Sequence, residues 1–203
     1  MMEKKFAGVI SVLFHPMLMP SYALVLLLNL NYFISYDYTF EIKAYLVVFV
    51  FIMTFALPAI LMVLLKKVRA IESLKMDDRK ERMLPLAMMA VIYYITYYSL
   101  RRTGILITFN LFLLGTTIVT LFTLVVNMYT KISLHMVSMG GIAGALLGLL
   151  LNYPIDLQWM LYLLILLSGL VGYARLTVSN HTLRQVYNGF MMGFVIMLAL
   201  FVM

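Results

Sequence analysis

Long apolar stretches recur along the whole chain, and they constrain its fold more than any other feature. A helix needs about 20 apolar residues to cross the hydrocarbon core of a bilayer, where every backbone N–H and C=O must be bonded within the protein. The sequence has seven apolar stretches separated by short polar segments. We therefore expect an all-α, polytopic membrane helical bundle with six to seven transmembrane helices, at residues 6–30, 43–65, 84–100, 104–126, 140–151, 157–172 and 186–203.

Composition bounds the number of domains and excludes some chemistry. Hydrophobic residues fill 65% of the 203 positions and charged residues only 11%, which leaves no stretch for a separate soluble domain. We expect a single integral-membrane domain over residues 1–203. The sequence contains no cysteine, which excludes disulfides and thiolate chemistry.

The first apolar stretch contains His15, Pro16 and Pro20. Proline interrupts the hydrogen bonds of a helix, so we expect a kinked first helix, or a re-entrant one if the chain crosses six times. Pro58 predicts a second kink, in the second stretch. His15 has two interpretations. An ionisable residue inside a membrane is a candidate for function, but a histidine beside a kink can instead bond a backbone carbonyl that the kink releases.

Charge is concentrated in a few connections between the stretches. Residues 66–82 hold seven of the fifteen basic residues. If the chain crosses seven times, this connection, residues 127–138 and residues 173–185 share one membrane face with the N-terminus. That face carries twelve Lys and Arg against three on the other, which predicts a cytoplasmic orientation. The positive excess also suits a phosphate or an anionic lipid headgroup.

The polar residues of this face have the chemistry of a phosphate site. Arginine and lysine bind phosphate oxygens, arginine through two parallel hydrogen bonds. Two imidazoles can act together in phosphoryl transfer: one attacks phosphorus as the nucleophile, and the other protonates the leaving oxygen as the general acid. Cations outnumber carboxylates here and no metal-binding motif occurs, so we expect neither a metal nor a cofactor. The candidate residues are Lys75, Arg82, Lys131, Ser133, His135, Arg175 and His181.

Three pairs among these residues have the order and spacing of known motifs. They are Lys75 with Arg82, Ser133 with His135, and Arg175 with His181, separated by six, one and five residues. This pattern resembles the type 2 phosphatidic acid phosphatase superfamily, integral-membrane lipid phosphatases related to vanadium haloperoxidases. Their motifs read Lys-x6-Arg-Pro, Pro-Ser-Gly-His and Ser-Arg-x5-His-x3-Asp. The resemblance implies a phosphatase-like core at about 66–203 and leaves two leading spans, 6–65, outside it.

The resemblance implies a role for each residue. His181 would be the nucleophile that forms a phosphohistidine, and His135 the acid for the leaving group. The phosphoryl oxygens would be held by Lys75, Arg82, Ser133 and Arg175, with Lys131 and Asp78 as accessory residues. The implied enzyme is a metal-independent phosphohydrolase that acts on a lipid phosphate or polyprenyl pyrophosphate at the membrane–water interface of a bacterial inner membrane. Many family members place this site on the outer face, against the charge count.

The sequence departs from the motifs at several positions. Ile132 and Leu134 replace the Pro and Gly of the second motif, Ala174 replaces the Ser of the third, and Gln185 replaces its Asp. A glutamine four residues after His181 on a helix can orient the imidazole but cannot neutralise its developing charge.

The loss of that charge keeps two alternatives to an enzyme open. One is a catalytically impaired pseudo-phosphatase that binds or carries anionic phospholipids. The other is a transporter unrelated to the family, with His15 at its centre. A membrane lipid phosphate is the expected partner and nucleic acid is not, while the oligomeric state does not follow from these residues.

Overall fold

The computed structural model describes residues 2–29, 38–74, 76, 78–101, 107–179 and 181–203. The structure confirms the predicted all-α polytopic bundle, because these residues form helices and no strand. Seven segments are long and apolar enough to cross a membrane, so the chain is an integral, multi-pass membrane protein. They are Met2–Asn29, Phe40–Lys67, Lys80–Arg101, Ile107–Tyr129, Leu134–Asn152, Gln158–Val178 and Leu183–Val202.

The chain forms two compact units. The first unit combines Met1–Pro16 with Tyr129–Met203, and the second is Met17–Met128. The first contains α1 (Met2–Leu13), α7 (Leu134–Asn152), α8 (Gln158–Val178) and α9 (Leu183–Val202). The second contains α2 (Met19–Asn29), α3 (Phe40–Phe51), the π-helical turn η3 (Ile52–Ala56), α4 (Leu57–Lys67), the 3-10 turn η4 (Lys80–Arg82), α5 (Met83–Arg101) and α6 (Ile107–Tyr129). The single domain expected over residues 1–203 stays a prediction.

Prolines interrupt the first two membrane segments. In the first, α1 ends at Leu13, and the 3-10 turn η1 (Pro16–Leu18) precedes α2, so the predicted kink is a break in the helix. In the second, Pro58 has no N–H to donate to the carbonyl four residues earlier. The helix widens there into the turn η3, in which the Leu57 N–H bonds the Ile52 carbonyl.

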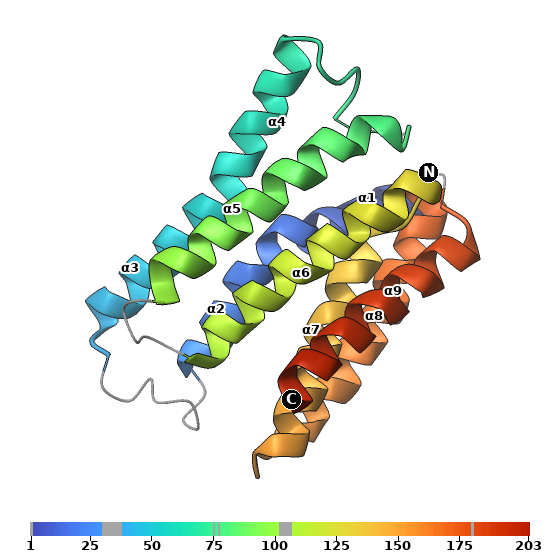
Figure 1. Cartoon of the computed structure of the whole chain (residues 1–203). Helices are drawn as coiled ribbons and strands as arrows, with labels where there is room; N and C mark the ends of the chain where they lie inside the picture. Colours follow the sequence, from blue (N-terminus) through green and yellow to red (C-terminus); the bar gives the residue numbers. More distant parts are fainter. Residues whose placement is uncertain (1, 30–37, 75, 77, 102–106, 180) are drawn as a thin grey trace. The chain divides into compact units, whose positions relative to one another are not determined.

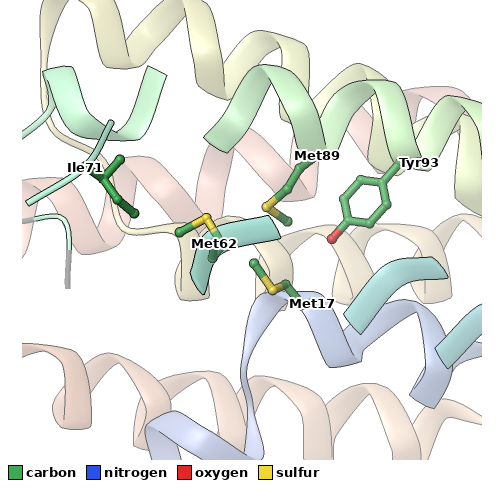
Figure 2. Packing of buried hydrophobic residues seen from close by; sticks show 5 residues of the cluster. All are labelled: Met17, Met62, Ile71, Met89 and Tyr93. Carbon is green, nitrogen blue, oxygen red and sulfur yellow. The ribbon is translucent and has the colours of Figure 1, made fainter. Parts of the chain in front are cut away.

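Flexible methionines dominate a buried cluster of the second unit. Figure 2 shows Met62 on α4 and Met89 on α5 with their side chains turned toward Met17. Ile71 and Tyr93 complete the cluster. Unbranched methionine side chains fill irregular gaps between helices, which accounts for this use of a residue that occurs eighteen times in the chain. Beside the cluster, α4 and α5 leave a small apolar cavity, lined in part by both prolines of these helices.

In the first unit, α7, α8 and α9 pack side by side, as Figure 1 shows in yellow-orange to red. Short connections join them, and α1 packs against α8. Successive contacts between α7 and α9 rise together in residue number, from Gly140 beside Phe190 to Gly144 beside Phe194. These two helices are therefore parallel, and α8 runs antiparallel between their ends. As a result, α7 and α9 begin at the same end of the unit, where α8 finishes.

Small residues allow α7 and α9 to touch along their backbones. A Cβ atom added to Gly140 would lie 2.0 Å from the Phe190 carbonyl oxygen, and one added to Gly144 would lie 2.2 Å from that of Phe194. A Cβ atom added to Gly193 on α9 would lie 2.0 Å from the Val137 carbonyl oxygen. Membrane helices associate by this close packing of small residues. The glycines of α7 thus form a face without side chains, and this face fixes the register between α7 and α9.

Several predicted boundaries are wrong near the candidate site. The connection predicted over residues 127–138 is limited to residues 130–133, because α6 continues to Tyr129 and α7 starts at Leu134. The sixth span was expected at 157–172, but α8 extends to Val178, so Arg175 lies on a helix. At the end of α6 and at the end of α8, the helix continues through polar residues because its backbone hydrogen bonds are still formed there. The start predicted for the fourth span, Gly104, lies outside the described residues.

Candidate functional site

Three helix termini of the first unit meet where the second and third motifs lie. Ser133 is the N-cap of α7, Thr182 is the N-cap of α9, and Arg175 lies in the last turn of α8. The Ser133 N–H donates to the Gln185 carbonyl at 3.4 Å, which ties the start of α7 to the first turn of α9. The structure therefore brings together residues that are about fifty positions apart in the sequence.

His181 is held from one side by Gln185. The Nδ1 atom of His181 lies 3.0 Å from the Gln185 Oε1, and the Thr182 N–H donates to the same atom at 3.2 Å. A backbone N–H can bond only to an acceptor, so this second bond identifies the amide oxygen. Because this oxygen can only accept a hydrogen bond, a neutral His181 ring must carry its proton on Nδ1. The lone pair is then on Nε2, which is the atom available to attack an electrophile.

The bonds around Gln185 also explain how α9 begins. The Thr182 hydroxyl accepts from the Gln185 N–H at 3.4 Å, while the Gln185 side chain bonds the Thr182 N–H. This reciprocal pair is a capping box, which satisfies N–H groups that lack partners in the first turn of a helix. The pattern Thr-x-x-Gln at 182–185 is the sequence signal for the start of this helix.

Ser133 has a buried hydroxyl next to these groups. The residue is 0% exposed, and its Oγ has no hydrogen-bond partner among the described residues. Its carbonyl accepts from the Met136 and Val137 N–H groups at 3.0 Å each, as the first turn of α7 requires, but its side chain does not cap the helix. Leaving such a hydroxyl unpaired costs about 1–3 kcal/mol. The hydroxyl is thus a buried donor at a helix N-terminus, which itself favours anions.

His135 lies in the first turn of α7 and contacts α1. Its Nε2 is 2.9 Å from the Ser11 carbonyl oxygen. The rings of His135 and His15 meet edge to face, with centroids 5.5 Å apart and an angle of 82° between the planes. The three histidines of the chain, His15, His135 and His181, therefore all lie in the first unit.

Arg175 places a positive charge among these rings. It interacts electrostatically with both His15 and His135. Its position in the last turn of α8 suits a cation, since the carbonyl end of a helix dipole is negative. The Ser179 N–H and hydroxyl both donate to its carbonyl. The neighbouring Ala174, which replaces the Ser of the third motif, is 0% exposed and packs inside the unit.

The first-motif residues belong to the second unit. Lys75 lies outside the described residues. Arg82 ends η4, is 7% exposed, and donates from Nε to the Met76 carbonyl at 2.8 Å. Asp78, predicted as an accessory residue, is exposed and accepts from the Lys80 N–H at 3.1 Å, which is a local turn contact.

The turn that carries Arg82 is held by a residue that sequence analysis missed. Asn127 on α6 is 1% exposed, and its Nδ2 donates to the Arg79 carbonyl at 2.7 Å. It falls in the segment predicted as a loop, so its place on the buried face of a helix could not be recognised. In the first unit, the accessory candidate Lys131 is half-buried in the connection before α7.

The fold and these contacts define a class of protein but no family. Among the described residues, no group of three or more His, Asp and Glu side chains is placed to hold a metal ion. A scan against known protein families and searches of the curated proteins and of the solved structures found no match. The molecule is an all-α, multi-pass membrane protein with an imidazole and arginine cluster where helix ends meet.

Proposed function

We propose that this protein is an integral-membrane phosphohydrolase that removes phosphate from a lipid phosphate or a polyprenyl pyrophosphate through a phosphohistidine intermediate. The observation that carries the proposal is the bond between His181 and Gln185, 3.0 Å from Nδ1 to Oε1, because it presents Nε2 as a nucleophile. The unpaired hydroxyl of Ser133, joined to the same turn of α9 through its backbone, supports it.

The proposed reaction has two displacement steps at phosphorus. In the first, the Nε2 lone pair of His181 forms a bond to phosphorus while the bond to the leaving oxygen breaks. That oxygen receives a proton, which the family resemblance assigns to His135. In the second, water attacks phosphorus, the bond to Nε2 breaks, and inorganic phosphate leaves. His135 accepts the proton of the water, so both histidines return to their starting states.

Positive and hydrogen-donating groups would stabilise the charge on the phosphoryl oxygens. This electrostatic contribution is usually the largest in phosphoryl transfer. The Ser133 hydroxyl, Arg175 and the N-terminal N–H groups of α7 and α9 supply it in the first unit. The family pattern adds Lys75 and Arg82, which the parity of seven crossings predicts on the same membrane face.

The surroundings favour an amphiphilic substrate. A site at the ends of membrane-crossing helices lets the chain of a lipid stay in the bilayer while its phosphate reaches water. The charge count favours a site on the cytoplasmic face, whereas family precedent often puts it outside. The membrane that we propose is a bacterial inner membrane.

One observation favours a second candidate function. The acceptor that holds His181 is the neutral oxygen of Gln185, and it is shared with the Thr182 N–H. A neutral acceptor stabilises an imidazolium less than a carboxylate does, and hydrogen bonds to charged groups contribute about 1.5–3 kcal/mol against about 1 for neutral ones. A pseudo-phosphatase that binds phosphate lipids with little turnover is the alternative.

Phosphate release from lipid phosphates and pyrophosphates, in detergent without divalent metal, tests the proposal. We expect release by the native chain, its loss in His181→Ala, and its retention in Asn188→Ala, a change at an exposed polar position on α9. Acid-labile phosphate trapped on native protein but not on His181→Ala would identify the intermediate. If no substrate is hydrolysed while phosphatidic acid vesicles still bind the native chain and not Arg175→Ala, the lipid-binding function replaces the enzymatic one.

A further inference from the structure

Helix α1 reaches the candidate site although no motif includes it. Near its start, the Tyr173 hydroxyl of α8 donates to the Glu3 carboxylate. Near its end, the Ser11 carbonyl contacts His135 Nε2 at 2.9 Å, and the His15 ring follows directly after the last turn. These two regions of contact are about eight residues apart, or roughly 12 Å along a helix. The end of α1 is therefore fixed against the first turn of α7.

The break in the first membrane segment explains why His15 can reach His135. Pro16 has no N–H and restricts the residue before it to extended conformations, so the helix cannot continue through His15. The last backbone bonds run from the Phe14 N–H to the Ile10 carbonyl at 2.9 Å and from the His15 N–H to the Val12 carbonyl at 3.2 Å. The carbonyl of Ser11 is left to accept from a side chain, and His135 takes this place.

The contact with Ser11 determines where the proton of His135 lies. A backbone carbonyl only accepts hydrogen bonds, so the Nε2 of His135 must carry a proton. In the neutral ring the lone pair is then on Nδ1, which is the opposite tautomer to that of His181. When His135 is cationic, Nε2–H stays bonded to the carbonyl and Nδ1 carries the exchangeable proton. Nδ1 is therefore the atom through which His135 can give a proton to a leaving oxygen.

The His15 ring stands where it can maintain this geometry. Aromatic rings that meet edge to face at 5.5 Å attract each other through their quadrupoles. An imidazole without such a neighbour can rotate by half a turn about its Cβ–Cγ bond, which places Cε1 where Nε2 was and breaks the bond to the Ser11 carbonyl. With the His15 ring in place, the orientation in which Nε2 donates to Ser11 is favoured over the rotated one.

We propose that His15 is a positioning residue of this site, which holds His135 with Nε2 bonded to the Ser11 carbonyl and Nδ1 free for proton transfer. The catalytic part of this inference rests on the proposed phosphohydrolase function, but the orientation of His135 does not. We assign this effect to the ring of His15, so another aromatic ring in its place should supply it.

Nuclear magnetic resonance of the full chain in detergent, labelled with ¹⁵N in its histidine rings, tests the orientation directly. The chain has three histidines, so single substitutions assign every ring signal. We expect the Nε2–H tautomer for His135 and the Nδ1–H tautomer for His181 in the native protein. His15→Ala should move the His135 signals toward an average of the two tautomers and leave His181 unchanged. His15→Phe, which keeps an aromatic ring, should restore the native His135 pattern.

A matched control and an activity measurement complete the test. Val12→Ala changes an exposed residue of the same helix turn and should leave all ring signals unchanged. In phosphate release, His15→Ala should lower kcat roughly tenfold with KM unchanged, a part of the 10²–10⁴ that a placed general acid contributes. His15→Phe should recover most of this loss.

The outcomes separate this inference from the proposed function. Native His135 signals in His15→Ala, or failure of His15→Phe to restore them, would overturn the positioning role even if the protein hydrolyses lipid phosphates. The expected signals without any hydrolysis would support the positioning of His135 and refute the phosphohydrolase. If His15→Ala does not fold, magnetisation transfer between the ring protons of His15 and His135 in the native chain decides, and its absence refutes the inference.

Discussion

Replacing Gln185 by glutamate is the most informative single change in the candidate site. Glutamate has the same length as glutamine, so its carboxylate can accept both hydrogen bonds that the amide oxygen accepts, from Thr182 N–H at 3.2 Å and from His181 Nδ1 at 3.0 Å. It also completes the capping box with the residue most often found there. The substitution therefore adds a charge without requiring a change of geometry.

The expected gain follows from the charge that develops on His181. When Nε2 attacks phosphorus, the ring becomes cationic, and its bond to a carboxylate becomes a charged hydrogen bond. Such bonds contribute about 1.5–3 kcal/mol, compared with about 0.5–1.5 kcal/mol for neutral ones. The difference of about 1–1.5 kcal/mol applies mainly to the transition state and corresponds to roughly a tenfold rise in kcat. KM should rise, because the carboxylate repels the phosphate.

The assay is phosphate release under saturating substrate, compared among native protein, Gln185→Glu and Gln185→Met. Methionine fills similar space without an acceptor, so its kcat should fall below the native value. Unfolding of each variant in mixed detergent is the control, and the glutamate should be neutral or stabilising because it lies in the first turn of α9. A folded Gln185→Glu with unchanged kcat, or equal values for the glutamate and the methionine, would refute the role assigned to this bond.

Three further predictions concern the elements that position the site. Gly144→Ala should destabilise the protein by about 1–3 kcal/mol, because its Cβ would lie 2.2 Å from the Phe194 carbonyl oxygen. Unfolding in mixed micelles measures this change in stability. The control is Gly169→Ala, whose Cβ would meet nothing within 4 Å and which should cost little stability. Thr182→Ala should cost about 1 kcal/mol by removing the N-cap of α9, and Thr182→Ser should retain stability in the same measurement. Asn127→Leu removes the bond to the Arg79 carbonyl and should cost about 1–3 kcal/mol. If Arg82 binds substrate, KM in phosphate release should also rise in that variant, and an unchanged KM would argue against this function of the turn.

The apolar segments were predictable, but their ends near the site were not. Hydropathy decides whether a segment can lie in lipid, and in the described part of the chain the predicted stretches correspond to seven segments long and apolar enough to span a membrane. A polar residue such as Asn127 or Arg175 can extend a helix when its side chain finds a partner in the folded protein. Asn127 bonds the Arg79 carbonyl, forty-eight residues away, and no local pattern contains that information.

The candidate site was predictable to the extent that it is local. The contact between His181 and Gln185 follows from a spacing of four residues at the start of a helix. The contact between Ser133 and the first turn of α9 could not be predicted without the register of α7 against α9. The glycines fix that register only if the two helices are known to be parallel, which the structure alone shows. The contact of His15 with His135 joins residues 120 positions apart, and the only local sign was the proline that ends α1.

The replacement of the family's Asp by Gln185 has a different meaning in the structure than in the sequence. From the sequence it reads as the loss of a charge and therefore as evidence against an enzyme. The contacts separate two functions of the missing carboxylate. One is to fix the tautomer of His181, and the Gln185 oxygen performs it, since the Thr182 N–H identifies that oxygen as the acceptor. The other is to stabilise the cationic ring, which a neutral oxygen does only in part. An enzyme with a correctly oriented but weakly stabilised nucleophile should be slow and not inactive. The choice between phosphohydrolase and lipid-binding protein thus depends on one rate, and Gln185→Glu should raise it.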